Sequence, residues 1–503
     1  MEAILTAAEM SKLDETTINY FRVPPEVLME RAALSVADII AKEGLDTGDV
    51  LVICGSGNNG GDGFAIARIL TERGINSHIL YTGKSDPSSM SRQARLQKEI
   101  CYKYEVPMET PGDFDWASDG STLIIDAMFG IGLNRPLDEK NIDIVKKINE
   151  AGADGAYILS VDIPSGIATD TGKVLGAAVK ADMTVTFGYK KQGHLLYPGA
   201  EHTGRLICTD IGINDRAFMD SGPACTAIEP SDLPCIHRKD YSNKGTYGKV
   251  LIAAGSKDIG GCALLAVKAA FACGAGMVRV FTHEANRDLI LNNCPEAMVD
   301  THSDIYFEER KLLEAMEWAD VLAIGPGITR SSSSAGMLKL MLERSQKPLV
   351  IDADAIYLLK EHEDHLLKNH TRDIIITPHI MEMAGFLDIE KSVILDDIIH
   401  AARITAERLN LICVLKDTRT VITGPSSRYR LNTSGNNGMA CAGMGDTLFG
   451  IIAGLLAQKL PAFDAASYGA FIHGHAADKA VLEVGKSALS ARDVISYLKE
   501  CFE

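Results

Sequence analysis

Acidic side chains that close glycine-rich loops or strands are the residues of this chain best placed for chemistry. Asp446 closes residues 436–446, which are rich in small side chains and lead directly into the apolar run 447–457. Backbone amides of such a loop, together with the positive end of a helix dipole, bind phosphate. We therefore predict a phosphate site here, with Asp446 able to take a proton from a substrate hydroxyl. The alternative is an aspartate that only caps the following helix.

A second glycine-rich loop, residues 55–63, follows the apolar strand predicted at 50–54 and precedes a helix predicted to begin near Phe64. A strand, a glycine loop and a helix in this order are typical of phosphate binding. The loop matches the dinucleotide fingerprint, but the next predicted strand, 77–82, ends without the acidic residue expected about 20 residues later. We therefore do not expect hydride transfer from bound NAD; a purely structural turn is the alternative.

Two further predicted strands end in acids, Asp126 after 122–125 and Asp162 after 157–161. The carboxyl ends of parallel strands share one edge of a sheet, so both acids and the loop of Asn59 should converge there. Oxygen ligands from such residues suit a hard cation, and these loops contain no His or Cys, so zinc is not expected.

The length of 503 residues suits two or three domains, and strands alternating with helices in both halves predict an α/β fold. Between residues 213 and 234 the periodic pattern gives way to turn-forming residues. We therefore expect one domain over residues 1–222 and a second over 223–503.

The composition limits the partners and the compartment. A net charge of −17 argues against nucleic acid as the main ligand. The 11 cysteines lie scattered without a C-x-x-C pair, which is typical of a reducing compartment. The start lacks a signal-peptide pattern, and the apolar window 448–460 is too short to span a membrane. We expect a cytoplasmic protein that binds neither nucleic acid nor membrane.

The segments 58–63, 126–136 and 162–166, in this order, resemble the NAD(P)H-hydrate epimerase family, and the likeness covers roughly residues 1–220. The resemblance implies a Rossmann-like three-layer α/β/α sandwich that interconverts the R and S hydrates NADHX and NADPHX. It implies potassium coordination by Asn59, Asp126 and Ser165. It also implies that the hydrated nucleotide is bound by Asn58, Asn59, Gly60, Gly61, Asp62, Gly130, Ile131, Gly132, Leu133, Asn134, Arg135, Pro136 and Asp162. Our hypothesis is that Asp162 moves the proton; the alternative is an aspartate that caps the turn 164–166.

The segments 325–327, 352–355, 377–379, 416–420 and 443–446 resemble the ADP- or ATP-dependent NAD(P)H-hydrate dehydratases, a branch of the ribokinase-like fold, over about residues 230–503. The resemblance implies Mg²⁺, a homo-oligomer, and ADP or ATP as phosphoryl donor, with ADP favoured by the likeness to bacterial-type fused enzymes. The residues implied at the hydrated nucleotide are Cys262, Gly327, His379 and Asp446, and those at the adenine nucleotide are Lys416, Asp417, Thr418, Arg419, Thr420 and Gly445.

Several positions depart from the usual pattern of the dehydratases. Cys262 stands where alanine is common, Ile380-Met381 where Pro-Gly is common, and Asn437 where proline is common. Asp417 stands where glycine is common after the lysine. Its carboxylate would repel a phosphate unless it points away or meets Arg419.

The two likenesses together predict the repair of one damaged metabolite. Hydroxide leaves poorly from the C6 carbon of the hydrated ring, and phosphorylation turns it into a good leaving group. Asp446 would take the hydroxyl proton, while the amides of 443–445, Mg²⁺ and Lys416 would stabilise the moving phosphoryl group. The rival interpretation is a ribokinase-like small-molecule kinase with a non-catalytic N-terminal binding domain. The presence of Asn59, Asp126, Asp162 and Ser165 argues against a dead first site.

Overall fold

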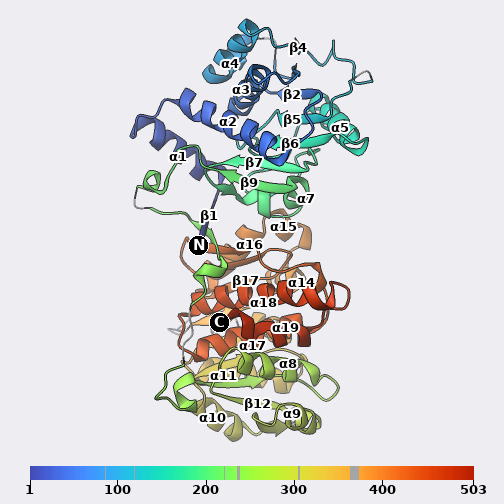
Figure 1. Ribbon diagram of the computed structural model, residues 1–503. Helices are drawn as coiled ribbons and strands as arrows, with labels where there is room; N and C mark the ends of the chain where they lie inside the picture. Colours follow the sequence, from blue (N-terminus) through green and yellow to red (C-terminus); the bar gives the residue numbers. More distant parts are fainter. Residues whose placement is uncertain are drawn as a thin grey trace. The chain divides into compact units, whose positions relative to one another are not determined.

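The computed structural model describes residues 1–84, 86–117, 119–219, 221–234, 238–303, 306–362 and 373–502. The chain divides into two compact units (Figure 1). The N-terminal unit is Ala3–Ala224, and the C-terminal unit is Cys225–Glu503 together with Met1–Glu2. Within the described ranges, no helix combines the length and the apolar character needed to cross a membrane.

The N-terminal unit is built on a parallel sheet. Its strand order is β4 (Met108–Glu109), β3 (Ser77–Tyr81), β2 (Val50–Cys54), β5 (Leu123–Ala127), β6 (Tyr157–Val161), β7 (Met183–Phe187) and β9 (Arg205–Thr209). The chain passes from β2 to β3 on one side and returns to β5 on the other. The strand order therefore reverses between β2 and β5, and in α/β sheets the ligand crevice lies outside the carboxyl ends of the strands at such a point.

Helices cover both faces of this sheet, because the strand residues alternate between two cores. Val50 and Val52 pack in one core with α2 (Pro25–Glu43) and α3 (Asn58–Glu72), whereas Leu51 and Ile53 pack in the other with α5 (Glu139–Ala153). The period of two is that of a strand buried on both faces. The remaining elements are α1 (Ala7–Asn19), α4 (Arg92–Lys103), α6 (Gln192–Leu195), α7 (Gly199–Thr203) and a short parallel pair, β1 (Glu2–Leu5) with β8 (Lys190–Lys191). The expected α/β/α sandwich is confirmed.

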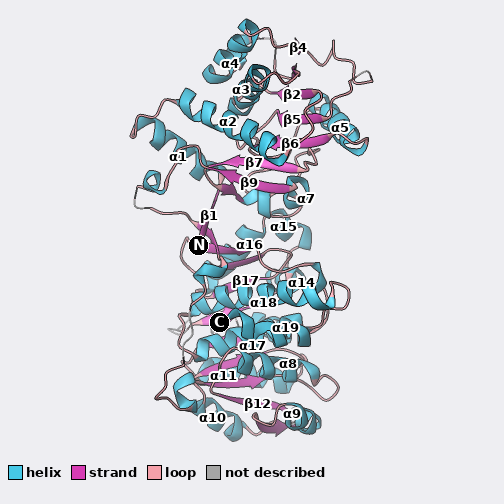
Figure 2. Cartoon of the chain, in the orientation of Figure 1, coloured by secondary structure: helices cyan, strands magenta, loops and turns pink. Residues whose placement is uncertain are grey.

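The C-terminal unit is a second, larger α/β sheet (Figure 2). Its order is β13 (Met298–His302), β12 (Met277–His283), β11 (Lys249–Ala253), β14 (Val321–Ile324), β15 (Leu349–Ile351), β16 (Ile374–Ile376), β17 (Ile412–Leu415), β18 (Thr420–Thr423), β19 (Tyr429–Asn432) and β10 (Cys225–Ala227). The strands from β13 to β17 are parallel, and β17, β18 and β19 pair antiparallel.

The helices of this unit follow the strands as the alternating pattern predicts. They are α8 (Gly261–Ala272), α9 (Arg287–Asn293), α10 (Glu309–Trp318), α11 (Ser332–Arg344), α12 (Asp354–Lys360), α14 (Ile380–Leu387), α15 (Lys391–Asp396), α16 (Ile398–Leu409), α17 (Met444–Ala457), α18 (Ala462–Val484) and α19 (Ala491–Tyr497). Helix α17 is the buried helix expected from the apolar run. A Cβ on its Gly450 would lie 2.3 Å from the carbonyl oxygen of Ala266 in α8, so glycine allows the two helices to pack closely.

In both glycine-rich loops, residues 55–63 and 436–446, the following helix begins earlier than the sequence predicts. Helix α3 begins at Asn58, not near Phe64, with the extended residue Gly57 as its N-cap. A Cβ on Gly60 would lie 2.0 Å from the carbonyl oxygen of Gly55, so the first turn fits over the strand end only because residue 60 is glycine. Likewise α17 begins at Met444, which places Gly445 and Asp446 in its first turn. Gly60 and Gly445 therefore lie in helical turns and not in open loops, and Gly60 allows its turn to pack against the end of β2.

Candidate functional site

A cavity of about 880 Å³ opens at the carboxyl edge of the N-terminal sheet, beside the point where the strand order reverses. The predicted residues that line it are Asn58, Asn59, Asp62, Gly130, Ile131, Gly132, Leu133, Asn134, Arg135 and Asp162. Other predicted residues lie elsewhere: Pro136 is exposed, and a Cβ on Gly61 would meet the Met29 side chain at 2.6 Å. Gly60 and Gly61 therefore shape the wall of the cavity by packing.

Asp162 is held at this cavity by a buried lysine. The Lys191 ammonium group donates to Asp162 Oδ1 at 2.7 Å, to Thr186 Oγ1 at 2.7 Å and to the carbonyl oxygen of Phe187 at 3.1 Å. Burial alone would raise the pKa of Asp162, but the Lys191 charge and hydrogen bond outweigh it and lower the pKa below its usual value. Asp162 is therefore a fixed carboxylate.

The backbone of Asp162 is strained, and a histidine supports it. Its φ of +67° lies in the left-handed region that non-glycine residues seldom adopt. His194 Nδ1 accepts from the Lys191 amide, so its Nε2–H donates to the carbonyl oxygen of Asp162 at 2.8 Å. Burial and the neighbouring Lys191 lower the pKa of His194 to about 4, which keeps the ring neutral.

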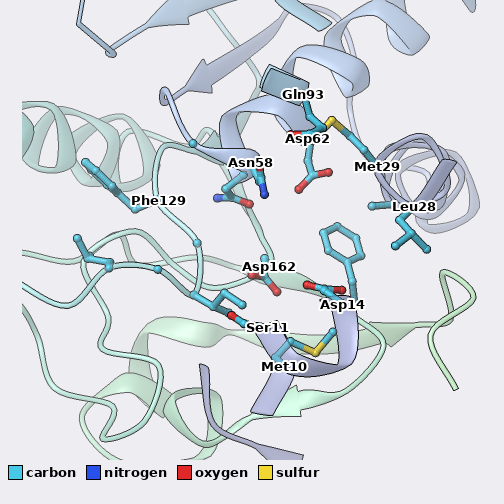
Figure 3. A pocket seen from close by; sticks show the side chains of 18 of the residues that line it. Met10, Ser11, Asp14, Leu28, Met29, Asn58, Asp62, Gln93, Phe129 and Asp162 are labelled. Atoms are coloured by element: carbon cyan, nitrogen blue, oxygen red, sulfur yellow. The ribbon is translucent and has the colours of Figure 1, made fainter. Parts of the chain in front are cut away.

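Two more carboxyl groups enter the cavity. Figure 3 shows Asp62 of α3, Asp14 of α1 and Asp162 around the same space. Burial, with the nearby Asp162 and Asp14 charges, raises the pKa of Asp62 well above its usual value. Burial also raises the pKa of Asp14 to about 6, against the lowering effect of Lys191. The cavity thus combines an ionised carboxylate with carboxyl groups that hold protons more tightly.

The three residues predicted at potassium are oxygen donors at one edge of the sheet. Asp126 is fully buried and accepts from Ser165 Oγ at 2.6 Å, and a Cβ on Gly130 would lie 3.1 Å from Asn59 and 3.3 Å from Asp162. Asn59 is 7% exposed, and the nitrogen and oxygen of its side-chain amide are buried without a hydrogen-bond partner among the described residues. A buried amide oxygen without a partner among the described residues, together with a carboxyl group and a hydroxyl at the same edge of the sheet, fits a hard cation in donor type.

Asp446 in the C-terminal unit lies near a second buried lysine–aspartate pair. Lys416 Nζ, at the end of β17, donates to Asp352 Oδ1 at 2.9 Å, at the end of β15. A Cβ on Gly445 would lie 3.4 Å from the same ammonium group and 3.8 Å from Asp352. Burial and the Asp352 charge raise the pKa of Asp446 to about 6, although Lys416 opposes this. The amino end of α17, a lysine and a proton acceptor therefore meet at one place.

His379 is engaged with its own helix. Its Nδ1 accepts from the backbone amides of Met381 and Glu382 at 3.1 and 3.2 Å, which makes it the N-cap of α14. Its Nε2 lies 3.2 Å from Glu382 Oε1. Burial raises the pKa of Glu382 to about 7. The contacts of His379 that the structure records are thus those of a capping residue with a half-exposed ring.

Cys262 and Gly327, predicted at the hydrated nucleotide, lie together. Gly327 has a φ of +65°, and a Cβ on it would lie 2.6 Å from Cys262 Sγ. Burial, with the Asp446 charge next, raises the pKa of the Cys262 thiol to about 12. Cys262 is therefore a small neutral side chain at physiological pH.

Of the residues predicted at the adenine nucleotide, 416–420 form the turn between β17 and β18, whereas Gly445 lies in the first turn of α17. Asp417 and Thr418 are exposed, Thr420 begins β18, and Arg419 donates to the carbonyl oxygen of Thr433 at 3.1 Å. Lys416 points into the unit, whereas Asp417 is exposed to solvent.

Sequence analysis did not identify Lys191 or Asp14 as functional residues. Lys191 is the second of two consecutive lysines after β7 and belongs to no motif, so nothing in the sequence distinguishes it from Lys190. Asp14 lies in α1, an amphipathic helix, and in such a helix an acidic residue is predicted to face solvent. Asp352 lies in the segment 352–355, to which the sequence assigned no individual role, and the sequence pattern did not point to Glu382.

Comparison with known proteins agrees with both resemblances. Residues 250–500 match the family model described as NAD(P)H-hydrate dehydratase, and residues 25–193 match the one described as YjeF-related protein N-terminus. Among solved structures, an ADP/ATP-dependent NAD(P)H-hydrate dehydratase from Bacillus subtilis co-crystallised with ATP and Mg²⁺ is 30% identical, with a TM-score of 0.48 over 55% of this chain and 96% of that one.

Two curated relatives match nearly the whole chain. The bifunctional NAD(P)H-hydrate repair enzyme of Moorella thermoacetica is 34% identical over 98% of this chain and 96% of its own length. The bifunctional NAD(P)H-hydrate repair enzyme of Escherichia coli is 34% identical over 94% of this chain and 88% of its own length. This chain therefore belongs to the family of bifunctional NAD(P)H-hydrate repair enzymes.

Proposed function

We propose that this chain repairs hydrated nicotinamide nucleotides in two steps. The domain over residues 1–222 interconverts the R and S forms of NADHX and NADPHX. The domain over 223–503 dehydrates the S form to NADH or NADPH, with ADP or ATP as phosphoryl donor. The observation that carries the proposal is the meeting of Asp446, Lys416 and Gly445 at the amino end of α17, because phosphoryl transfer needs a base, a cation and backbone amides at one point.

In the dehydration, Asp446 takes the proton of the C6 hydroxyl as its oxygen attacks the terminal phosphoryl group. Lys416 and the amides of Gly443 and Gly445 stabilise the negative charge on the moving group. The C6–O bond then breaks with loss of phosphate, as the ring nitrogen's electrons restore the double bond. Mg²⁺ would enter with the nucleotide and neutralise phosphate charge. That fits the described residues, among which no cluster of three His, Cys, Asp or Glu is arranged to hold a metal, because Mg²⁺ is commonly held by substrate phosphates and water.

In the epimerisation, Asp162 is the carboxylate that exchanges a proton at the reacting C6 centre. Lys191 keeps it ionised and His194 holds its backbone. Asn59, Asp126 and Ser165 would hold potassium beside it, and a bound cation would supply positive charge at that edge of the cavity. The partnerless amide of Asn59 supports this assignment.

The test is recovery of absorbance at the NADH band from a chemically prepared mixture of R and S NADHX. The full-length chain is supplied with Mg²⁺, K⁺ and either ADP or ATP. Full recovery of both epimers is expected, and comparing the two nucleotides identifies the donor. Replacing K⁺ by tetramethylammonium should limit recovery to the S fraction, because epimerisation alone would lose its cation.

Other outcomes contradict parts of the proposal. Recovery that stops at the S fraction with K⁺ present would exclude epimerisation. A stable phosphorylated product without recovery of NADH would favour the kinase interpretation.

A further inference from the structure

The cavity of the N-terminal unit holds more acid–base groups than a single carboxylate step requires. Asp62 and Asp14 share it with Asp162, from three separate elements. Among the described residues, neither Asp62 nor Asp14 has a side-chain hydrogen-bond donor, whereas Asp162 has two, Lys191 and Thr186. The carboxyl groups of Asp62 and Asp14 thus face the cavity and are not held by a hydrogen bond from a described side chain.

A carboxyl group in this position suits a proton donor. Asp14, Asp62 and Asp162 disfavour one another's ionisation in this cavity, because each negative charge raises the free energy of the next. Lys191 stabilises the charge on Asp162, so Asp162 is the carboxyl group of the three that ionises most readily. Glu15 and Arg135 also line the cavity, but no interaction with Asp62 is recorded for either, whereas Asp14, Asp162 and Lys191 all act on its charge.

We propose that Asp62 is the general acid of the epimerisation and that Asp162 is its partner base, an inference that rests on the proposed function. Asp62 donates its proton to the C6 hydroxyl of the hydrated ring. The C6–O bond breaks with its electron pair on oxygen, water leaves, and the lone pair of the ring nitrogen forms a C6=N1 iminium. Water then adds to the opposite face of C6, the π pair returns to nitrogen, and Asp162 takes the proton of the adding water.

The step is balanced without any redox partner. One proton moves from Asp62 to Asp162 as one water leaves and one adds. Asp162 then returns the proton to Asp62 through water, because the Lys191 charge makes the ionised form of Asp162 the stable one. Burial, and after it the Asp162 and Asp14 charges, raise the pKa of Asp62 well above its usual value, so Asp62 holds its proton more tightly than an ordinary aspartate.

The first arm of the test uses the wild-type full-length chain in H₂¹⁸O, with K⁺ and without ADP or ATP, so that no dehydration competes. One separated epimer of NADHX is supplied, and the product is analysed by chromatography and mass spectrometry. We expect one ¹⁸O atom at C6 for each inversion. Inversion with retention of the original oxygen would overturn the proposal, because opening the C6–N1 bond keeps that oxygen.

The second arm identifies the acid. Asp62→Asn should lower kcat about 100-fold or more, with KM changed less than threefold. Asp38→Asn, whose carboxylate is 67% exposed on α2, is the matched control and should keep the wild-type rate. An Asp62→Asn rate within threefold of wild type would overturn the assignment. Failure of the wild-type chain to interconvert the epimers would instead remove the proposed function, and the inference with it.

The pH profile adds a readout that a structural role would not move. Wild-type kcat should fall at alkaline pH as Asp62 loses its proton. Asp14→Asn removes a negative charge beside Asp62, so the alkaline limb should shift to lower pH. An alkaline limb unchanged in Asp14→Asn would contradict the coupling of the two carboxyl groups.

Discussion

Both units place a buried lysine–aspartate pair at the carboxyl edge of their sheet, but the two pairs face their sites in opposite ways. In the N-terminal unit Lys191 is 1% exposed and gives all three of its protons to protein acceptors, while Asp162 faces the cavity. In the C-terminal unit Asp352 is 2% exposed and Lys416 is 19% exposed, and Asp352 is the one acceptor that Lys416 has among the residues described there. In the N-terminal unit the buried Lys191 holds the Asp162 carboxylate toward the cavity. In the C-terminal unit the buried Asp352 holds the Lys416 ammonium group.

The difference teaches how the same ion pair can serve two reactions. The Asp162 carboxylate suits proton exchange with the C6 hydroxyl of the hydrated ring, because Lys191 sets both its pKa and its position. A lysine with spare protons suits the negative charge of a transferred phosphoryl group. Changing one partner of each pair should therefore affect the two activities separately.

The largest expected effect is at the base of the C-terminal site. Asp446→Asn should lower dehydration about 1,000-fold, because the amide cannot take the hydroxyl proton. Epimerisation should be unchanged, since Asp446 lies in the other compact unit. Both rates are measured on one preparation, by NADH absorbance and by chromatography of the epimers. Dehydration at a comparable rate would show that Asp446 is not the base.

The next effect concerns stability of the N-terminal unit. Lys191→Met leaves Asp162 buried without its cation, which should cost about 3 kcal/mol or more and lower the unfolding temperature of this unit by roughly 5–10 °C. The folded-state pKa of Asp162, lowered in the wild type, should rise above the unfolded value in the variant. The deficit should therefore be full at neutral pH and shrink as Asp162 becomes protonated at lower pH.

Calorimetry at pH 5 and pH 8 checks this prediction. Lys103→Met is the matched control, because its side chain is 71% exposed on the surface of α4. Equal stability of Lys191→Met and Lys103→Met would mean that the pair contributes nothing to folding.

A smaller effect is expected from pH on the wild-type dehydration. With burial raising the pKa of Asp446 to about 6, the base is ionised above this pH and protonated below it. The rate should fall about tenfold for each pH unit below 6 and be flat above 7, since only the ionised form accepts the proton. The epimerisation profile should differ, because the pKa of Asp162 is lowered and not raised. Coincident acid limbs for both reactions would contradict the assignment of two separate bases.

The sequence predicts the strands and the functional residues at their ends well. It predicts the helix starts and the buried residues that support those functional side chains less well. Buried parallel strands such as β2 and β5 are continuous apolar runs, and the acid that closes each run marks the crevice. Helix starts are less visible, because Gly60 and Gly445 read as loop residues, although both lie in the first turns of helices. Such a placement depends on backbone contacts from distant strands.

The supporting residues of the sites could not be predicted for a related reason. Lys191 and Asp14 gain their roles from burial beside Asp162, which local patterns do not encode. His379 shows the reverse case, since its position at a strand end suggests a ligand contact while its Nδ1 caps a helix. Whether the Asp417 carboxylate faces a bound phosphate depends on the direction of its side chain, which the sequence does not determine; in the structure Asp417 is exposed.

The smallest predicted effect tests the space beside Lys416. A Cβ on Gly445 would lie 3.4 Å from Lys416 Nζ and 3.8 Å from Asp352, in helical backbone that alanine adopts without strain. Gly445→Ala should therefore fold with unchanged or slightly higher stability, yet weaken nucleotide binding by about tenfold, because the methyl group occupies the place proposed for phosphate. Gly261→Ala at the start of α8 meets nothing within 4 Å and is the matched control. Titration calorimetry with ADP and ATP measures both variants. Equal affinity in the two would mean that the phosphate does not approach the amino end of α17 at this position, and that Lys416 reaches its ligand from another side.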